Sequence, residues 1–155
     1  MKVEQIETPG KNDFNEFVVE NNGSFLQSFE WGEFQKQTGR EIFRLAAEEN
    51  GPPAAHERSD GGRGKIIGAA TIILFRLPFK KTYLYCPRGP VIANLETPFP
   101  SKKIFAVFLE KIKEIAKKEN AIFLKIEPDE NFPADLNLID SEFKKSTKEI
   151  QPSET

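Results

Sequence analysis

Hydrophobic and polar positions follow two different patterns along this chain, one typical of strands and one typical of helices. Residues 41–49 and 65–77 are rich in β-branched and apolar residues, and a polar segment rich in glycine and proline separates them. That arrangement predicts two strands of a long antiparallel hairpin. Alternating positions at residues 80–86 and 121–127 predict two further strands, and a weaker alternation at residues 3–6 predicts a short opening strand.

Other segments repeat apolar residues every three or four positions, as amphipathic helices do. A first helix is predicted from an Asn12 cap to Asn21, and a second from about Ser28 to Thr38. A third is predicted from a Ser101 cap to about Asn120. Its apolar stripe comprises Ile104, Phe105, Val107, Phe108, Ile112, Ile115 and Ala116.

The order of these elements predicts an α/β fold in which helices flank a mixed, mainly antiparallel sheet. The third helix lies between strand 80–86 and strand 121–127, so these two strands should be parallel neighbours. A chain of 155 residues with 38% apolar composition can bury one sizeable core, which predicts a single domain over residues 1–155. The hairpin connection, residues 51–64, is longer than a hairpin needs and is expected to be a mobile surface loop with His56 in solvent.

One stretch, residues 80–92, joins an alternating strand to a stiff turn. Tyr83 and Tyr85, the two tyrosines of the chain, should lie on one face of the strand, and Cys86 should face the core on the other. The turn that follows, Pro87-Arg88-Gly89-Pro90, has two prolines that restrict the backbone and a glycine that tolerates a positive φ. Arg88 is therefore expected on a stiff turn.

A guanidinium held beside a face of tyrosines suits a planar anion such as a carboxylate or a phosphate. The residues alone leave a second interpretation open, because proline and glycine punctuate many strand ends. In that interpretation Arg88 is a solvated side chain without a ligand.

Four segments, in order along the chain, resemble the Fem family of peptidoglycan-bridge aminoacyltransferases. Residues 85–91 resemble its Y-x-P-[RK]-G-P-V signature, and residues 25–35 resemble its F-x-Q-S-x-x-W-x-x-x-Q segment. Residues 123–129 resemble a strand ending in [RK]-[IV]-[ED]-P, and residues 150–155 resemble I-Q-P-x-x-T. The resemblance thus extends over most of the chain.

This resemblance implies an acetyltransferase-like (GNAT-type) fold, built in the family as two tandem units. Because the chain ends at Thr155 inside the fourth matching segment, we expect the first unit alone, inactive without a second. The implied activity is transfer of an amino acid from aminoacyl-tRNA to the stem-peptide side-chain amine of a peptidoglycan precursor. That precursor would be a nucleotide-linked or lipid-linked muramyl pentapeptide, and no cofactor is implied.

The site residues follow from the resemblance and from the residue types. Arg88 with Tyr85 and Tyr83 is the expected precursor-binding set, and Trp31 and Lys36 on the second helix are additional candidates. For Trp31 a place in the core is the alternative, since aromatic residues at helical spacing are usually buried. For Lys36 the alternative is a solvated lysine. No catalytic residue can be named.

Two acidic residues, Glu127 and Asp129, form a carboxylate pair that could suit acid–base chemistry. A glutamate at a strand end before a proline is more commonly an anchor for the loop. The predicted third helix carries six lysines and three glutamates, which could contact RNA phosphates or could form a solvated face with paired charges.

Composition narrows the classes of function. The net charge of −2 argues against a protein that coats nucleic acid, and one Cys with one His excludes an internal disulfide framework or a zinc site of such ligands. No apolar run approaches the length that spans a bilayer, and the first residues lack the pattern of a signal peptide. A cytoplasmic protein is therefore expected.

Two alternatives to the aminoacyltransferase remain: an acetyl-CoA-dependent N-acetyltransferase and a non-catalytic domain that binds cell-wall precursors. The acetyltransferase would need a pyrophosphate-binding loop. Residues 58–64 imitate one, but Arg63 stands where a small residue is required, and a predicted strand follows instead of a helix. This segment is therefore interpreted as a plain loop.

Overall fold

The computed structural model describes residues 1–49, 64–93, 98–128, 130, 132 and 143–144. These residues form a sheet with strand order β1-β2-β3-β4-β6, and β5 pairs with β3 beyond the end of β4. The strands are β1 (Lys2–Gln5), β2 (Glu41–Glu48), β3 (Ile66–Arg76), β4 (Thr82–Pro87), β5 (Val91–Ile92) and β6 (Ala121–Glu127). The helices are α1 (Lys11–Glu20), α2 (Phe29–Gln37) and α3 (Pro98–Lys118), and the 3-10 turns are η1 (Thr8–Gly10), η2 (Phe25–Gln27) and η3 (Pro78–Lys80).

The strand pairing confirms the predicted hairpin and the predicted parallel pair. β2 and β3 are antiparallel, and β4 lies antiparallel on the other side of β3. The chain then crosses through α3 and returns as β6, which is parallel to β4. The short strand β5 is not predicted from the sequence, because two residues are too few to show a period.

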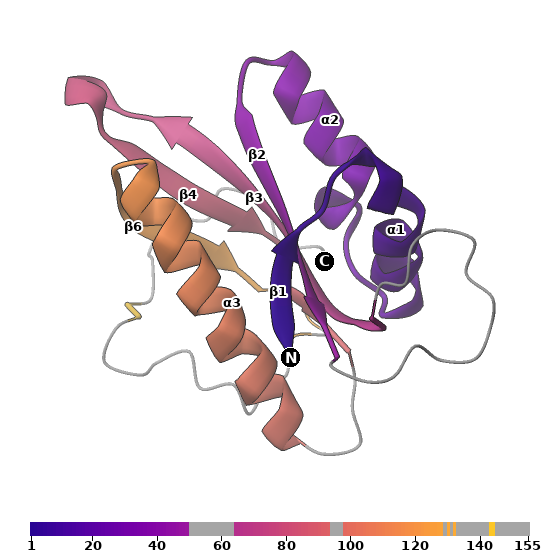
Figure 1. The fold of residues 1–155 in the computed structure, drawn as a ribbon. Helices are drawn as coiled ribbons and strands as arrows, with labels where there is room; N and C mark the ends of the chain where they lie inside the picture. Colours follow the sequence, from indigo (N-terminus) through magenta and orange to yellow (C-terminus); the bar gives the residue numbers. More distant parts are fainter. Residues whose placement is uncertain (50–63, 94–97, 129, 131, 133–142, 145–155) are drawn as a thin grey trace.

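Helices cover both faces of the sheet, with α3 on one side and α1 and α2 on the other (Figure 1). Alternation along the strands supplies both cores. Leu45 of β2 belongs to the same buried cluster as Phe108 of α3, whereas the neighbouring Ala46 belongs to the cluster that contains Phe14 of α1. The larger core lies beneath α3 and includes Cys86, which confirms that this side chain faces the interior.

Two predicted helix starts are wrong. The first helix begins at Lys11 after Gly10, so Asn12 lies inside the helix and caps nothing. The third begins at Pro98, and Ser101 is a buried residue within it. Proline is compatible with the first turn of a helix, because backbone N–H groups there have no partner within the helix. The helix can therefore begin with the segment Pro98-Phe99-Pro100. The start of α2 agrees with the predicted start near Ser28, and the structure shows that Ser28 caps this helix, because its Oγ accepts a hydrogen bond from the Trp31 N–H at 3.1 Å.

A buried arginine anchors α2 to the sheet. Arg44 of β2 is 3% exposed and donates to the Phe29 carbonyl at 3.0 Å and to Glu33 Oε1 at 2.7 Å. Its guanidinium lies 3.7 Å from the centroid of the Phe29 ring. Burial lowers the pKa of Arg44, and the Glu33 carboxylate opposes that shift. The charge is therefore buried with hydrogen-bonding partners and an aromatic face.

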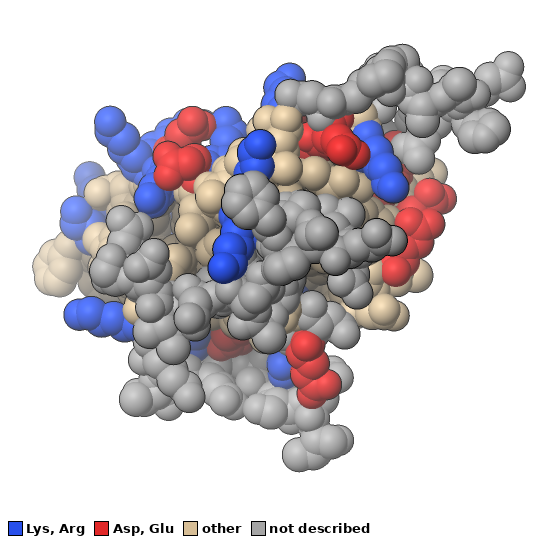
Figure 2. Space-filling model, turned by 90° about the horizontal axis from the view of Figure 1, so that it is seen from below, with Lys and Arg blue, Asp and Glu red and all other residues tan. Residues whose placement is uncertain are grey.

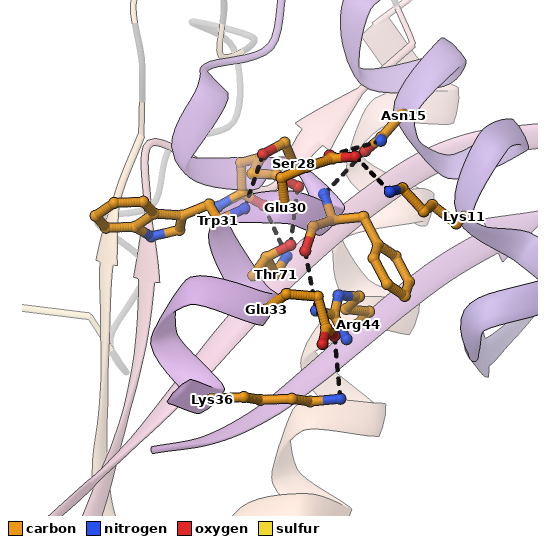
Figure 3. Close-up of polar contacts among 11 residues, drawn as sticks. Lys11, Asn15, Ser28, Glu30, Trp31, Glu33, Lys36, Arg44 and Thr71 are labelled. Atoms are coloured by element: carbon orange, nitrogen blue, oxygen red, sulfur yellow. Dashed lines mark hydrogen bonds and ion pairs between the residues drawn. The ribbon is translucent and has the colours of Figure 1, made fainter. Parts of the chain in front are cut away.

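Polar contacts also tie the start of α2 to α1 (Figure 3). Asn15 accepts a hydrogen bond from the Phe29 N–H and donates one to Glu30, both at 2.8 Å. Lys11 pairs with Glu30 at 2.7 Å, and this contact lowers the pKa of the Glu30 carboxyl. The N-terminus of α2 is therefore held by its serine cap and by side chains of α1.

Several predictions fall on residues outside the described part of the chain. They are the loop at residues 51–63 with His56, the carboxylate Asp129 and the matching segment at residues 150–155. The sequence also predicts a weak helical turn around residues 134–140 and a last strand at residues 147–151, and both lie outside the described residues.

Candidate functional site

The candidate site lies where the parallel strands β4 and β6 end together. Tyr85 pairs with Lys125 and Pro87 with Glu127, and the Gly89 N–H then donates to the Glu127 carbonyl at 3.2 Å. In open α/β sheets, ligands bind outside the carboxyl ends of parallel strands. The turn that carries Arg88 is at this end of β4.

Three side chains of the two strands form a polar cluster beside the turn. The Tyr85 hydroxyl donates to Glu127 Oε2 at 2.5 Å, and Lys125 Nζ lies 2.9 Å from Glu127 Oε1. The side chains of Lys125 and Glu127 are only 14% and 15% exposed, and Tyr85 is buried. Glu127 therefore serves as an anchor between the strands, which agrees with the simpler of its two predicted roles. The phenol of Tyr85 is held inside the protein.

Arg88 has an unusual backbone conformation. Its φ is +47°, in the left-handed region that residues other than glycine seldom adopt. The side chain is half-buried, and the next peptide bond, Gly89–Pro90, is cis. A non-glycine residue in this region costs about 1–3 kcal/mol and persists only where its surroundings impose it.

Gln27 supplies part of those surroundings. This side chain of η2 is fully buried, and its Nε2 donates to the Pro87 carbonyl. It also fills the space in front of Gly89, where an added Cβ would lie 2.5 Å from Gln27 Cδ. The pattern of hydrophobic and polar positions around Gln27 gave no indication of a functional role for this residue. The available signal was its position in the segment 25–35 that resembles the family.

Tyr83 is the centre of an aromatic ladder across three strands. Its ring stacks on Phe75 of β3 at a centroid distance of 5.0 Å and on Phe123 of β6 at 4.8 Å. Burial raises the pKa of the Tyr83 phenol, and the nearby Arg40 guanidinium opposes that shift. Stacked cross-strand rings stabilise a sheet, so this ladder fixes β6 beside β4.

Trp31 and Lys36 project in different directions from α2 (Figure 3). The Trp31 ring packs between two phenylalanine rings, with centroid distances of 6.0 Å to Phe25 and 5.3 Å to Phe34. Its indole Nε1 is buried without a hydrogen-bond partner. Lys36 instead pairs with Glu33 at 3.3 Å, on the side where Glu33 also accepts from Arg44. Tyr83 and Tyr85 therefore lie on β4 and Arg88 on the turn that follows it, whereas Lys36 belongs to a separate ion-pair network.

Charge is distributed without a single-sign face in the described surface seen in Figure 2, where basic and acidic side chains are interspersed. On α3, Lys111 pairs with Glu114 at 2.8 Å and Lys113 with Glu110 at 3.4 Å. These pairs favour the solvated interpretation of the lysine-rich helix. Attraction of an anion to the β4 end would accordingly depend on local groups such as Arg88.

Among the described residues, no three or more His, Cys, Asp or Glu side chains form a group able to hold a metal ion. In the same part of the chain, no helix has both the length and the apolarity that crossing a membrane requires.

Comparison with known proteins places the chain in a family. The sequence profile of the FemAB family matches residues 10–151. The chain belongs to the FemAB family. Two similar relatives are both called Lipid II:glycine glycyltransferase. The one from Staphylococcus aureus strain MRSA252 is 33% identical over 115 residues, and the one from strain bovine RF122 / ET3-1 is 32% identical over 109 residues.

These alignments cover 73% and 70% of this chain but only 23% and 22% of the two relatives. The chain therefore spans about a quarter of the length of the curated relatives that it matches. The matched portion contains the β4–β6 region described above, since the family profile extends across both strands.

Solved structures confirm the acetyltransferase-like fold expected for this FemAB chain. A putative acetyltransferase from Agrobacterium tumefaciens str. C58 superposes with a TM-score of 0.62 at 14% identity, covering 99% of this chain and all of that one. Glucosamine-6-phosphate N-acetyltransferase from Arabidopsis thaliana superposes with a TM-score of 0.58 at 14% identity, covering 99% of this chain and 97% of that one. Identities this low establish the shared fold alone.

Proposed function

We propose that this chain is the precursor-binding domain of an aminoacyltransferase that extends the interpeptide bridge of peptidoglycan. The transferred amino acid would pass from aminoacyl-tRNA to the stem-peptide side-chain amine of a muramyl pentapeptide linked to a nucleotide or a lipid. Membership of the FemAB family supports this proposal, as do relatives named for glycyl transfer to Lipid II. Residues 1–155 would act as one acetyltransferase-like domain.

The observation that carries the proposal is the conformation of Arg88. Its turn is held from β6 by the Gly89–Glu127 bond and from η2 by the Gln27 amide. A side chain on such a braced turn loses less conformational freedom when it binds, and a guanidinium can form two parallel charge-assisted bonds to a phosphate or carboxylate. We assign Arg88 to recognition of an anionic group of the precursor.

The other predicted site residues would support or extend this contact. Tyr85 would act from within the protein by fixing Glu127 and the end of β6. Tyr83 would fix the same strand through its stacking on Phe123. Trp31 and Lys36 would meet more distant parts of the precursor, with the indole N–H of Trp31 available to a ligand acceptor only after a local movement.

The reaction in question is aminolysis of an ester. A neutral amine attacks the acyl carbon, the C–N bond forms, the C–O bond to the tRNA ribose breaks, and the proton lost by nitrogen balances the one gained by the leaving oxygen. Such a reaction depends mainly on positioning two substrates and stabilising the oxyanion. A thiol nucleophile is not required, and burial raises the pKa of the Cys86 thiol to about 12, which leaves it unreactive.

Titration of the purified chain tests the proposal. The ligands are a muramyl-pentapeptide nucleotide, Lipid II in nanodiscs, an aminoacyl-tRNA and acetyl-CoA, each measured by calorimetry. We expect precursor binding, and we expect Arg88→Ala to weaken it by about 1.5–3 kcal/mol, or roughly 10- to 150-fold. Arg88→Lys should recover part of the affinity, because it keeps the charge and loses the bidentate geometry.

Unchanged precursor affinity in a folded Arg88→Ala variant would refute the role assigned to Arg88. Saturable binding of acetyl-CoA together with no binding of either precursor would instead identify an acetyltransferase. A third outcome would identify a non-catalytic binding domain. In it, the chain binds precursor, but the full-length protein that contains it transfers no amino acid.

A further inference from the structure

A local defect in the sheet lies next to the turn that carries Arg88. β3 pairs with β4 through residues 73–76 and with β5 through residues 68 and 69, which leaves residues 70–72 between the two partners. The register that sets Ile73 opposite Tyr85 would set Thr71 opposite Pro87. Proline has no N–H, so this pair cannot form a complete two-bond strand pairing.

The Gln27 side chain occupies this defect. Its Oε1 accepts the Thr71 N–H at 2.7 Å, and its Nε2 donates to the Pro87 carbonyl and lies 3.7 Å from Cys86 Sγ. The Gln27 backbone carbonyl accepts a further bond from the Thr71 hydroxyl at 2.8 Å. The side-chain amide therefore stands between β3 and β4 in the way that a peptide group of an inserted strand would.

Both ends of this bridge are backbone groups of buried residues, the N–H of Thr71 and the carbonyl of Pro87. An apolar side chain of the same size would fill the space but leave the Thr71 N–H and the Pro87 carbonyl without these bonds. The Pro87 carbonyl belongs to the peptide that leads directly into Arg88, the residue with a φ of +47°. Because this peptide is held in place, the backbone of the turn is restricted where it enters Arg88.

We propose that Gln27 is a positioning residue, whose buried amide holds the Arg88 turn in the conformation that binds the anionic group of the precursor. The same residue immediately precedes Ser28, the cap of α2, so the amide also sets the turn relative to the helix that carries Trp31. This inference rests on the proposed function of Arg88. Its first test does not depend on that function.

The first test measures the turn directly by limited trypsin digestion, with mass spectrometry of the cut between Arg88 and Gly89. In Gln27→Met the amide bonds are lost while the volume is nearly kept, and we expect this cut to become at least about tenfold faster. The matched control is Phe108→Leu, in the core beneath α3 on the other face of the sheet. This control is chosen to lower thermal stability by about as much as Gln27→Met does. It should leave the rate of this cut within about twofold of the wild-type rate. Should Gln27→Met fail to fold, Thr71→Val removes only the hydroxyl bond to the Gln27 carbonyl and should accelerate the same cut less strongly.

The second test is a double-mutant cycle on affinity for the muramyl-pentapeptide nucleotide. Gln27→Met should weaken binding about tenfold when Arg88 is present and less than about twofold in an Arg88→Ala background. Phe108→Leu should leave the affinity unchanged in both backgrounds. This coupling distinguishes positioning of Arg88 from general destabilisation, because loss of stability alone would act equally with or without the arginine.

An unchanged rate of cleavage at Arg88 in Gln27→Met would overturn the inference. Equal losses of affinity in the two backgrounds would also overturn it, provided that Arg88→Ala by itself weakens binding. Faster cleavage in a protein whose affinity does not respond to Arg88→Ala would uphold the structural role of Gln27 and refute the proposed function of Arg88. The two failures are therefore distinguishable.

Discussion

Replacing Gly32 by alanine should have two opposing effects on stability, a gain in helix propensity and a steric clash with a side chain of the sheet. Gly32 lies within α2, where alanine should be favoured over glycine by about 1 kcal/mol. In the folded protein, however, a Cβ on Gly32 would lie 2.5 Å from Arg44 Nη2 and 3.0 Å from both Cζ and Nε. The guanidinium as a whole would have to move.

That movement is costly, because Arg44 is buried and held by the Phe29 carbonyl, by Glu33 and by the Phe29 ring. Losing the bond of a charged donor to the Phe29 carbonyl costs about 1.5–3 kcal/mol. After subtraction of the helix-propensity gain, we expect Gly32→Ala to lower the free energy of unfolding by about 0.5–2 kcal/mol. For a chain of this size, 1 kcal/mol corresponds to a change of about 2–4 °C in Tm.

The assay is urea denaturation of four proteins: the wild type, Gly32→Ala, Arg44→Leu and the double variant. Leucine ends at Cδ and removes all three Arg44 atoms that crowd the new Cβ. In the Arg44→Leu background, Gly32→Ala should therefore become neutral or stabilising by up to about 1 kcal/mol. A stabilising Gly32→Ala in the presence of Arg44, or the same effect in both backgrounds, would refute the reasoning.

Two further predictions concern β4. Because burial raises the pKa of the Cys86 thiol to about 12, iodoacetamide at about pH 8 should label Cys86 only after denaturation, and labelling of the native protein would show that the thiol is accessible. Tyr85→Phe removes the 2.5 Å bond to Glu127 and should lower the free energy of unfolding by about 1–2 kcal/mol in urea denaturation. Tyr83→Phe, which keeps the stacked ring, is its matched control and should change stability by less than about 0.5 kcal/mol; equal effects of the two substitutions would contradict a stabilising role for the Tyr85 hydroxyl.

The strand and helix pattern was largely predictable because it depends on local periodicity. Two runs of β-branched and apolar residues predicted both strands of the β2–β3 hairpin within one residue of their observed ends, and the crossing helix correctly predicted the parallel pair of β4 and β6. Errors arose at the helix starts, where Asn12 and Ser101 are good capping residues but the chain enters the helix earlier. A preference for capping residues could not by itself exclude helical residues before Asn12 and Ser101.

The sequence by itself also identified the stretch around Arg88, because two tyrosines, two prolines and a glycine are unusual together at a strand end. Only the tertiary structure decided what surrounds it. The Gln27 amide reaches Thr71 across 44 positions of the chain, and Tyr85 reaches Glu127 across 42. A local pattern determines which face a side chain occupies, whereas bonds between distant segments exist only once the strands have come into register, and these bonds fix the conformation of the Arg88 turn.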